Sequence, residues 1–100
     1  MSLTITKVLG KDAAITIGGR LDTTTAPDLE AVLDEVLPTA ENLVFDLSKL
    51  EYISSAGLRL ILKAQKTMSK KGSMKIQHVP APVMEIFEIT GFADFLTIEG

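Results

Sequence analysis

Residues 43–58, LVFDLSKLEYISSAGL, decide the fold of this chain, because an apolar segment leads there through a serine-rich turn into a helical pattern. Residues 43–47 are apolar on both faces apart from Asp46, which is typical of a central parallel strand covered by helices. Ser54 and Ser55 follow this strand and open the helix. The first N–H groups of a helix have no partner inside it, so either serine would lie beside free donors.

The helix predicted from about Ser55 to Ser69 has an apolar face and an opposite basic face, and Gly72 is expected to end it. The inward row is Gly57, Ile61, Ala64 and Met68, with Leu58 and Leu62 beside it. The opposite row, called the basic row below, is Arg59, Lys63, Lys66 and Lys70. Two interpretations fit the basic row: a solvated helix face, or a docking stripe for an acidic partner in helical register with Ser55.

The N-terminal residues predict a hairpin. Residues 3–9 alternate as an edge strand would, with Leu3, Ile5 and Leu9 on one face. A second strand is predicted over residues 13–17, ended by Gly18 and Gly19. The link of residues 10–12 is short, so these two strands are expected to run antiparallel.

Two more helices are predicted. In the first, Thr24 or Thr25 can cap the start, Pro27 and Asp28 suit the first turn, and Pro38 stops it. Its apolar stripe is Leu29, Val32, Leu33, Val36 and Leu37. A strand over residues 74–79 precedes the second of these helices, which follows Pro80 and Pro82 and turns Val83, Ile86 and Phe87 inward. Gly91 is expected just past its end, with Phe92 folded back on Phe87, and residues 94–98 as a closing turn and strand.

The alternation of strands and helices predicts an α/β fold. We expect a mixed, mostly parallel sheet of four or five strands with an antiparallel N-terminal edge strand, three main helices and a short C-terminal element. Ligands and partners of such sheets meet the carboxyl ends of the strands. Asp22, Ser54 and Ser55 closely follow strands in the chain, so they are expected at that edge.

Composition narrows the function classes. The 100 residues, 46% hydrophobic and 23% charged, predict one globular domain over residues 1–100. The absence of cysteine fits the cytoplasm, and no apolar run is long enough to span a membrane. A net charge of -3 argues against direct nucleic-acid binding. Metal-ligand spacing, phosphate-binding glycine loops and a nucleophile elbow are absent, and His78 alone suggests no general base, so neither enzyme, metal nor cofactor is expected.

Ser54 and Ser55 admit two interpretations at this point. A serine at a helix start commonly caps it through its side-chain oxygen. The same position also suits a switch, because the N–H groups and the helix dipole can accommodate a phosphate on a serine. Such a phosphate would change the presented surface sharply with little damage to the fold.

Three stretches resemble the anti-sigma factor antagonists and the wider STAS domain family. Residues 19–26, GRLDTTTA, look like the family's Gly-x-Leu-Asp-x-x-Thr-Ala segment. Residues 43–58 resemble its apolar strand, Asp-Leu-Ser element and Asp-Ser-x-Gly-Leu turn. Residues 82–96 resemble its C-terminal helix and closing turn. Together they cover nearly the whole chain.

This resemblance implies a partner and a switch. It implies that the domain binds an anti-sigma factor that is also a serine kinase, that phosphorylation of Ser55 ends this binding, and that a serine phosphatase resets it. Ser54 stands where many phosphorylated members have aspartate, which makes it a rival acceptor. The expected partner-binding residues are Asp22, Thr25, Ser54, Ser55, Ala56, Gly57, Arg59 and Lys63.

Two other functions compete with this one. A STAS domain that is not phosphorylated could be a scaffold subunit of a transport or signalling complex. A small enzyme or nucleotide binder of the same layered class is the third candidate, which the missing phosphate loop and general base disfavour.

Overall fold

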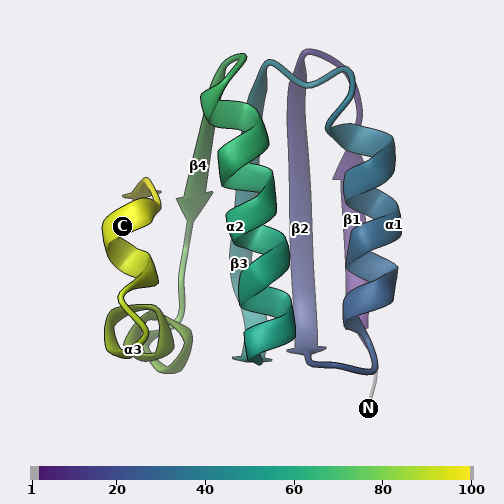
Figure 1. Ribbon diagram of the computed structural model, residues 1–100. Coiled ribbons are helices and arrows are strands. Elements are labelled where there is room, and N and C mark those ends of the chain that lie inside the picture. The colour runs from purple at the N-terminus through teal and green to yellow at the C-terminus, as the bar shows by residue number, and fades with distance from the viewer. Residues whose placement is uncertain (1–2, 100) are drawn as a thin grey trace.

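A five-stranded sheet with three α-helices forms the structure, a computed structural model that describes residues 3–99 (Figure 1). The strands lie in the order β1 (Leu3–Val8), β2 (Asp12–Leu21), β3 (Asn42–Ile53), β4 (Ser73–Gln77) and β5 (Ile98–Glu99). The helices are α1 (Ala26–Val36), α2 (Ser55–Ser69) and α3 (Ala81–Ile89), followed by the 3-10 helix η1 (Phe92–Phe95). The α/β class and the number of main elements are therefore confirmed.

Strand directions also agree with the sequence. β1 pairs antiparallel with β2, and β2, β3, β4 and β5 pair in parallel. All carboxyl ends of the parallel strands therefore lie at one edge of the sheet.

β2 is longer than predicted. Gly18 and Gly19 do not end it, because the strand continues to Leu21 with register shifts against β3 on both sides of this pair. A Cβ on Gly18 would stand 2.9 Å from the Thr4 hydroxyl oxygen and 3.1 Å from the Lys49 Cβ. Gly18 thus lets three strands approach one another at an irregular point of the ladder.

The helices α1 and α2 cover one face of the sheet (Figure 1). On β3 the residues Leu43, Phe45 and Leu47 are buried, whereas Val44 and Asp46 are only partly buried. The expectation that helices cover both faces of residues 43–47 was wrong, since these residues alternate as in a sheet with one covered face.

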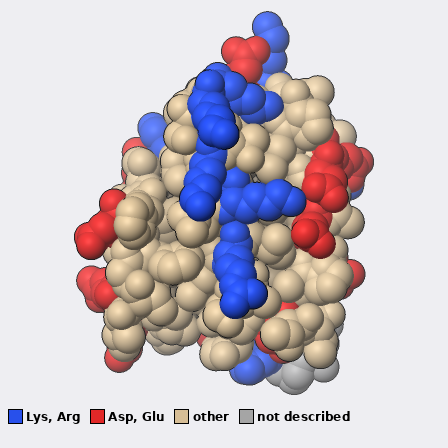
Figure 2. All heavy atoms as spheres, viewed as in Figure 1, with Lys and Arg blue, Asp and Glu red and all other residues tan. Residues whose placement is uncertain are grey.

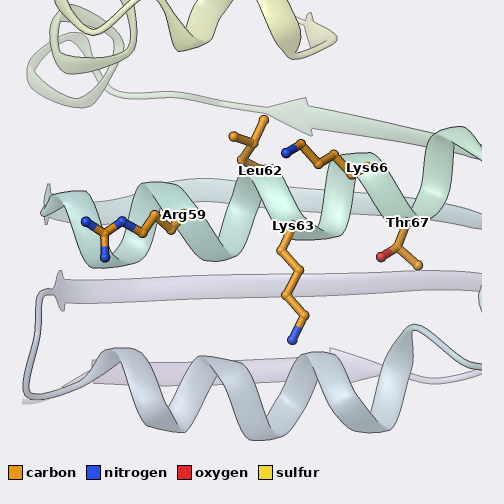
Figure 3. A pocket seen from close by; sticks show the side chains of 5 residues that line it. All are labelled: Arg59, Leu62, Lys63, Lys66 and Thr67. Carbon is orange, nitrogen blue, oxygen red and sulfur yellow. The ribbon is translucent and has the colours of Figure 1, made fainter.

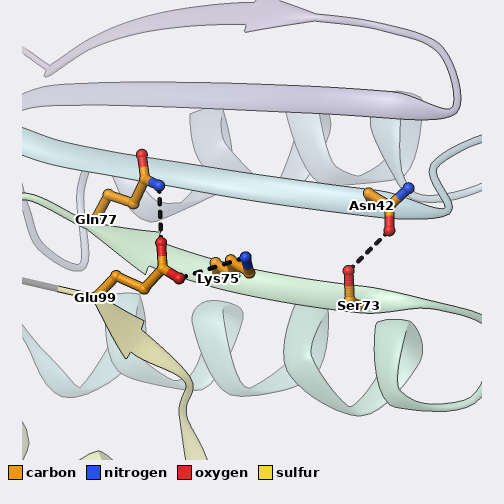
Figure 4. Close-up of polar contacts among 5 residues, drawn as sticks. All are labelled: Asn42, Ser73, Lys75, Gln77 and Glu99. Atoms are coloured by element: carbon orange, nitrogen blue, oxygen red, sulfur yellow. Dashed lines mark hydrogen bonds and ion pairs between the residues drawn. The ribbon is translucent and has the colours of Figure 1, made fainter.

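The uncovered face is polar along β4 and β5. Figure 4 shows it toward the viewer, with the helices behind: the Gln77 amide donates to the Glu99 carboxylate at 3.0 Å, and Lys75 pairs with the same carboxylate at 3.3 Å. Ser73 donates to the Asn42 side-chain oxygen at 2.8 Å at the other end of the strands.

The core lies between the sheet and the helices. Its largest fully buried side chains include Phe45 of β3 and Phe87 of α3. The inward row predicted for α2 is buried, and so is Leu60, which the sequence pattern did not place inside. In α1 the predicted stripe is buried except for Val32, which is partly buried.

Of two predictions for the C-terminal part of the chain, the end of the strand was wrong and the position of Gly91 is confirmed. The strand predicted over residues 74–79 ends at Gln77, and exposed His78 takes a positive φ of 57°, so the chain turns there toward α3. Gly91 follows α3 with a φ of 79°, the left-handed position expected of it. Within residues 3–99, no helix has the length and apolar character that crossing a membrane requires.

Candidate functional site

The site is built where β2 and β3 end side by side. Leu21 and Ile53 are paired in the parallel ladder, and the Ser54 N–H donates to the Leu21 carbonyl at 2.8 Å. This bond places the turn after β2, which begins with Asp22, directly beside the first residues of α2. The structure therefore brings together the polar residues that the sequence placed at this edge.

Ser54 and Ser55 have opposite environments. Ser55 is the first residue of α2 and is exposed. Ser54 is the N-cap residue, but its side-chain oxygen is buried, makes no capping bond, and has no hydrogen-bond partner among residues 3–99. The backbone carbonyl of Ser54 accepts the Leu58 N–H at 2.9 Å, so only the backbone of this residue bonds to the first turn of α2. Of the two hydroxyls, the one on Ser55 is open to a macromolecule.

Gly57 permits close contact between α2 and the strand ends. A Cβ there would stand 2.6 Å from Leu21 Cγ and 2.9 Å from Ile53 Cγ1, both in fully packed side chains of the core. The first turn of α2 can therefore lie directly on the last residues of β2 and β3. This contact fixes where Ser55 projects, and it gives Gly57 a packing role, since the residue is buried.

Asp22 and Thr25 support the turn before α1. The Asp22 carboxylate accepts the Thr24 hydroxyl at 2.7 Å and the Thr24 and Thr25 N–H groups at 3.0 and 3.2 Å. Thr25 is 7% exposed, and its hydroxyl donates to the Arg20 carbonyl at 2.9 Å. Thr25 occupies the N-cap position of α1, but its hydroxyl makes no capping bond, so that part of the expectation was wrong. The buried hydroxyl is committed to contacts within the turn.

The hydrogen bond from the Thr24 hydroxyl, more than any other contact, lowers the pKa of Asp22 below its ordinary value of 3.8. A carboxylate with a lowered folded-state pKa stabilises the fold fully above its unfolded pKa and loses this effect as pH falls through the folded pKa. We expect Asp22→Asn to have a lower thermal midpoint than the wild type at about pH 7, and the gap between the two midpoints to be smaller at about pH 2. A gap between the two midpoints that is the same at both pH values would contradict this role.

The basic row lies on the outer face of α2. Figure 2 shows it as a band along this helix, with acidic side chains on the side of α1. Lys63 extends toward α1, where its ammonium lies 4.0 Å from Glu30 and 3.9 Å from Asp34 (Figure 3). Arg59 is exposed and forms no ion pair within residues 3–99.

Two shallow hollows adjoin this row. One is lined by Arg59, Leu62, Lys63, Lys66 and Thr67 (Figure 3). The other lies between α1 and α2 beside Ser55 and is lined by Thr23, Ala26, Pro27, Glu30, Ala56, Arg59, Leu60 and Lys63. The second hollow combines apolar lining with charges of both signs.

The sequence patterns did not point to four residues near this site. Arg20 stacks over the Tyr52 ring at 4.3 Å, where these residues pair across β2 and β3. The carboxylates of Glu30 and Asp34 lie within ion-pair distance of the Lys63 ammonium. The sequence could have indicated that Glu30 and Asp34 act together, because residues four apart share a helix face. It could not have indicated the Arg20 stack, since this depends on the shifted register of β2.

Comparison with known proteins identifies the family to which this chain belongs. A family model described as "Mlab, STAS domain" matches residues 6–98. The chain belongs to the STAS domain family. The resemblance seen in its three stretches is thereby confirmed.

Curated relatives of this STAS domain are named as anti-sigma factor antagonists. It is 35% identical over 100 residues to BtrV of Bordetella bronchiseptica, named as a candidate anti-sigma factor antagonist, with 98% of this chain and 85% of the relative covered. It is 28% identical over 88 residues to the anti-sigma-B factor antagonist of Bacillus subtilis, covering 87% and 81% of the two chains.

Solved structures show the same fold. The domain matches an anti-sigma factor antagonist from Mycobacterium paratuberculosis with a TM-score of 0.87 and 23% identity, over 97% of this chain and 85% of that one. It matches SpoIIAA, an anti-sigma factor antagonist in its unphosphorylated form, with a TM-score of 0.79 and 15% identity, over 99% and 89% of the chains. A structure of Bacillus SpoIIAA in the phosphorylated form gives a TM-score of 0.72 and 14% identity over 99% and 92%.

Proposed function

We propose that this STAS domain is an anti-sigma factor antagonist, a binding module that captures an anti-sigma factor and is switched off by phosphorylation of Ser55. The names of its relatives support the class of protein. The observation that carries the switch is the exposed hydroxyl of Ser55 at the first residue of α2, next to a buried Ser54 hydroxyl. Such a switch would act in the cytoplasm.

The chemistry at Ser55 belongs to the partner. In the proposed step the Ser55 Oγ attacks the γ-phosphorus of ATP bound to a serine kinase, which is the anti-sigma factor itself. A bond forms between Oγ and phosphorus, the bond from phosphorus to the bridging oxygen breaks, ADP leaves, and the hydroxyl proton passes to a base of the kinase. A serine phosphatase would hydrolyse the ester and restore the hydroxyl. The domain would thus be a substrate and not a catalyst.

The proposed docking surface consists of Ser55, Ala56, Arg59, Lys63 and the hollow between α1 and α2. Its apolar lining by Pro27 and Leu60 can receive an apolar side chain, and its cations favour a partner with acidic residues at the rim. A phosphate on Ser55 adds roughly -1.5 to -2 charges within this surface. Such a partner would then meet repulsion where it had met a neutral hydroxyl.

The fold can bear this modification. Ser55 is exposed, so the phosphate displaces no packed group. Its position at the start of α2 places the negative charge at the positive end of the helix dipole, which favours it. Modification is therefore expected to change binding while leaving the core unchanged.

Release of a sigma factor tests this function. The unmodified domain is titrated into a purified complex of the cognate anti-sigma factor and its sigma factor, and free sigma factor is measured by size-exclusion chromatography. Stoichiometric release is expected with the unmodified domain and none with the phosphorylated one. If the domain never binds the anti-sigma factor, the proposed function is wrong. Association with transporter components, indifferent to Ser55→Ala, would favour the scaffold function instead.

A further inference from the structure

Arg59 lies one helical turn beyond Ser55 on the same face of α2. Residues four apart on a helix are neighbours, here separated by about 6 Å along the axis. Both residues are exposed. Figure 3 shows the Arg59 side chain lying along α2 with its guanidinium directed toward the N-terminal end of the helix, where Ser55 stands.

Among the described residues 3–99, no acidic group forms an ion pair with Arg59. Within residues 3–99 the ion pairs are made by Lys7, Lys11, Lys63 and Lys75. Glu30 lines the same hollow as Arg59 but lies 4.0 Å from the Lys63 ammonium, which also approaches Asp34. The guanidinium is therefore available to pair with an anion on α2.

Lys63 is a poorer candidate for a charge on Ser55. It lies two turns from that residue, about 12 Å along the helix axis. Its side chain points across to α1, away from the line between the two positions (Figure 3). Of the basic row, only Arg59 has both the spacing and the direction to reach Ser55.

We propose that Arg59 pairs with the phosphate of phosphorylated Ser55, so that one modification withdraws both a hydroxyl and a cation from the docking surface. The inference rests on the proposed function, because it concerns the modified state of the same serine. A guanidinium suits this task, since its planar donors can bind two phosphate oxygens at once. The order also favours the pair, with the anion nearer the helix N-terminus and the cation four residues later.

The pair changes how the switch works. Without it, the phosphate repels acidic groups of the partner while Arg59 still attracts them. With it, the phosphate pairs with the charge of Arg59, and Lys63 becomes the first residue of the basic row whose charge can attract the partner. Loss of affinity on phosphorylation then depends on Arg59. In Arg59→Gln, which lacks that attraction from the start, phosphorylation should weaken partner binding by a factor about three to ten smaller than in the wild type.

Arginine side-chain NMR tests the pair directly. Phosphoserine is introduced at position 55 by genetic incorporation, so the sample does not depend on any kinase. The chain has two arginines, Arg20 and Arg59, so the Nε–Hε signals are few and Arg59→Gln assigns them. We expect the Arg59 Hε signal to move downfield and to exchange more slowly with water in the phosphoserine form. Arg20, stacked over Tyr52, serves as the internal reference and should not move.

The outcomes separate this inference from the proposed function. An Arg59 signal unchanged by phosphoserine, or moved no more than that of Arg20, overturns the pair even if a kinase modifies Ser55. A shifted Arg59 signal in a domain that no cognate kinase modifies supports the pair and contradicts the proposed switch. As a matched control, Lys66→Gln removes one cation of the same row and should leave the Arg59 response intact.

Discussion

Replacement of Ser55 by aspartate is expected to weaken binding of the anti-sigma factor by at least about thirtyfold, or about 2 kcal/mol, while the domain stays folded. The carboxylate would stand on the exposed first residue of α2, in the proposed docking surface that also contains Arg59 and Lys63. An acidic partner meets a like charge there. The thermal midpoint should move by no more than a few degrees, because an exposed substitution usually changes stability by within about 0.5 kcal/mol and an acid at this position suits the helix dipole.

Ser55→Asn is the matched control. It has nearly the shape of aspartate without the charge, so it should retain affinity within about threefold. Calorimetric titration and thermal unfolding of both variants give the two readouts. Equal losses of affinity in Ser55→Asp and Ser55→Asn would show that shape and not charge governs the site. A large loss of stability in either would assign Ser55 to holding the helix start.

Replacement of Gly72 by alanine is expected to destabilise the fold by about 3 kcal/mol. Gly72 joins α2 to β4, and a Cβ there would stand 1.7 Å from the carbonyl oxygen of Glu41. That oxygen is fixed, because it accepts the Ser73 N–H at 2.9 Å while the Glu41 N–H donates to the Lys11 carbonyl at 2.8 Å. The clash therefore involves backbone that three segments hold in place.

Gly91→Ala provides the comparison. Gly91 has a φ of 79° with open space around its Cα, so alanine there meets backbone strain but no clash. It should cost about 1 kcal/mol, well below the cost at Gly72. Chemical denaturation of the two variants measures both values. A Gly72→Ala variant within about 1 kcal/mol of the wild type would contradict the tight contact between Gly72 and Glu41.

The sequence correctly predicted those features of the fold that are determined by residues close together in the chain. The bounds of α2, Ser55–Ser69, follow from its apolar periodicity and the serines before it, and both are visible in the chain. The left-handed position of Gly91 follows the usual end of a helix. The antiparallel pairing of β1 and β2 follows from a short link. Each of these depends on residues close together in the sequence.

Features that depend on distant residues were missed. Gly18 and Gly19 looked like a strand end, because the role of Gly18, which lets β2 lie close to Thr4 and Lys49, depends on the neighbouring strands. The polar uncovered face was missed because Val44 looks like a core residue until the helices are placed on the other side.

The same holds for the candidate site. The sequence pattern placed Ser54 and Ser55 at the sheet edge without distinguishing them, since adjacent serines at a helix start have the same pattern. The family resemblance assigned Ser55 as the acceptor and left Ser54 as a rival. The burial of the Ser54 hydroxyl depends on how the first turn of α2 packs at the ends of β2 and β3, which Gly57 permits. Thr25 likewise looked like a capping or binding residue, whereas its hydroxyl reaches back to the Arg20 carbonyl. Three-dimensional packing thus determines which hydroxyls are presented.

The central claim, that the exposed Ser55 hydroxyl is the acceptor of the switch, is tested most directly by intact mass after incubation with the cognate kinase and ATP. The wild type and Ser54→Ala are each expected to gain one phosphate group, and Ser55→Ala is expected to gain none. Ser54→Ala controls for the adjacent hydroxyl, which is buried in this structure. No phosphate on the wild type, or a gain that persists in Ser55→Ala, would contradict the claim.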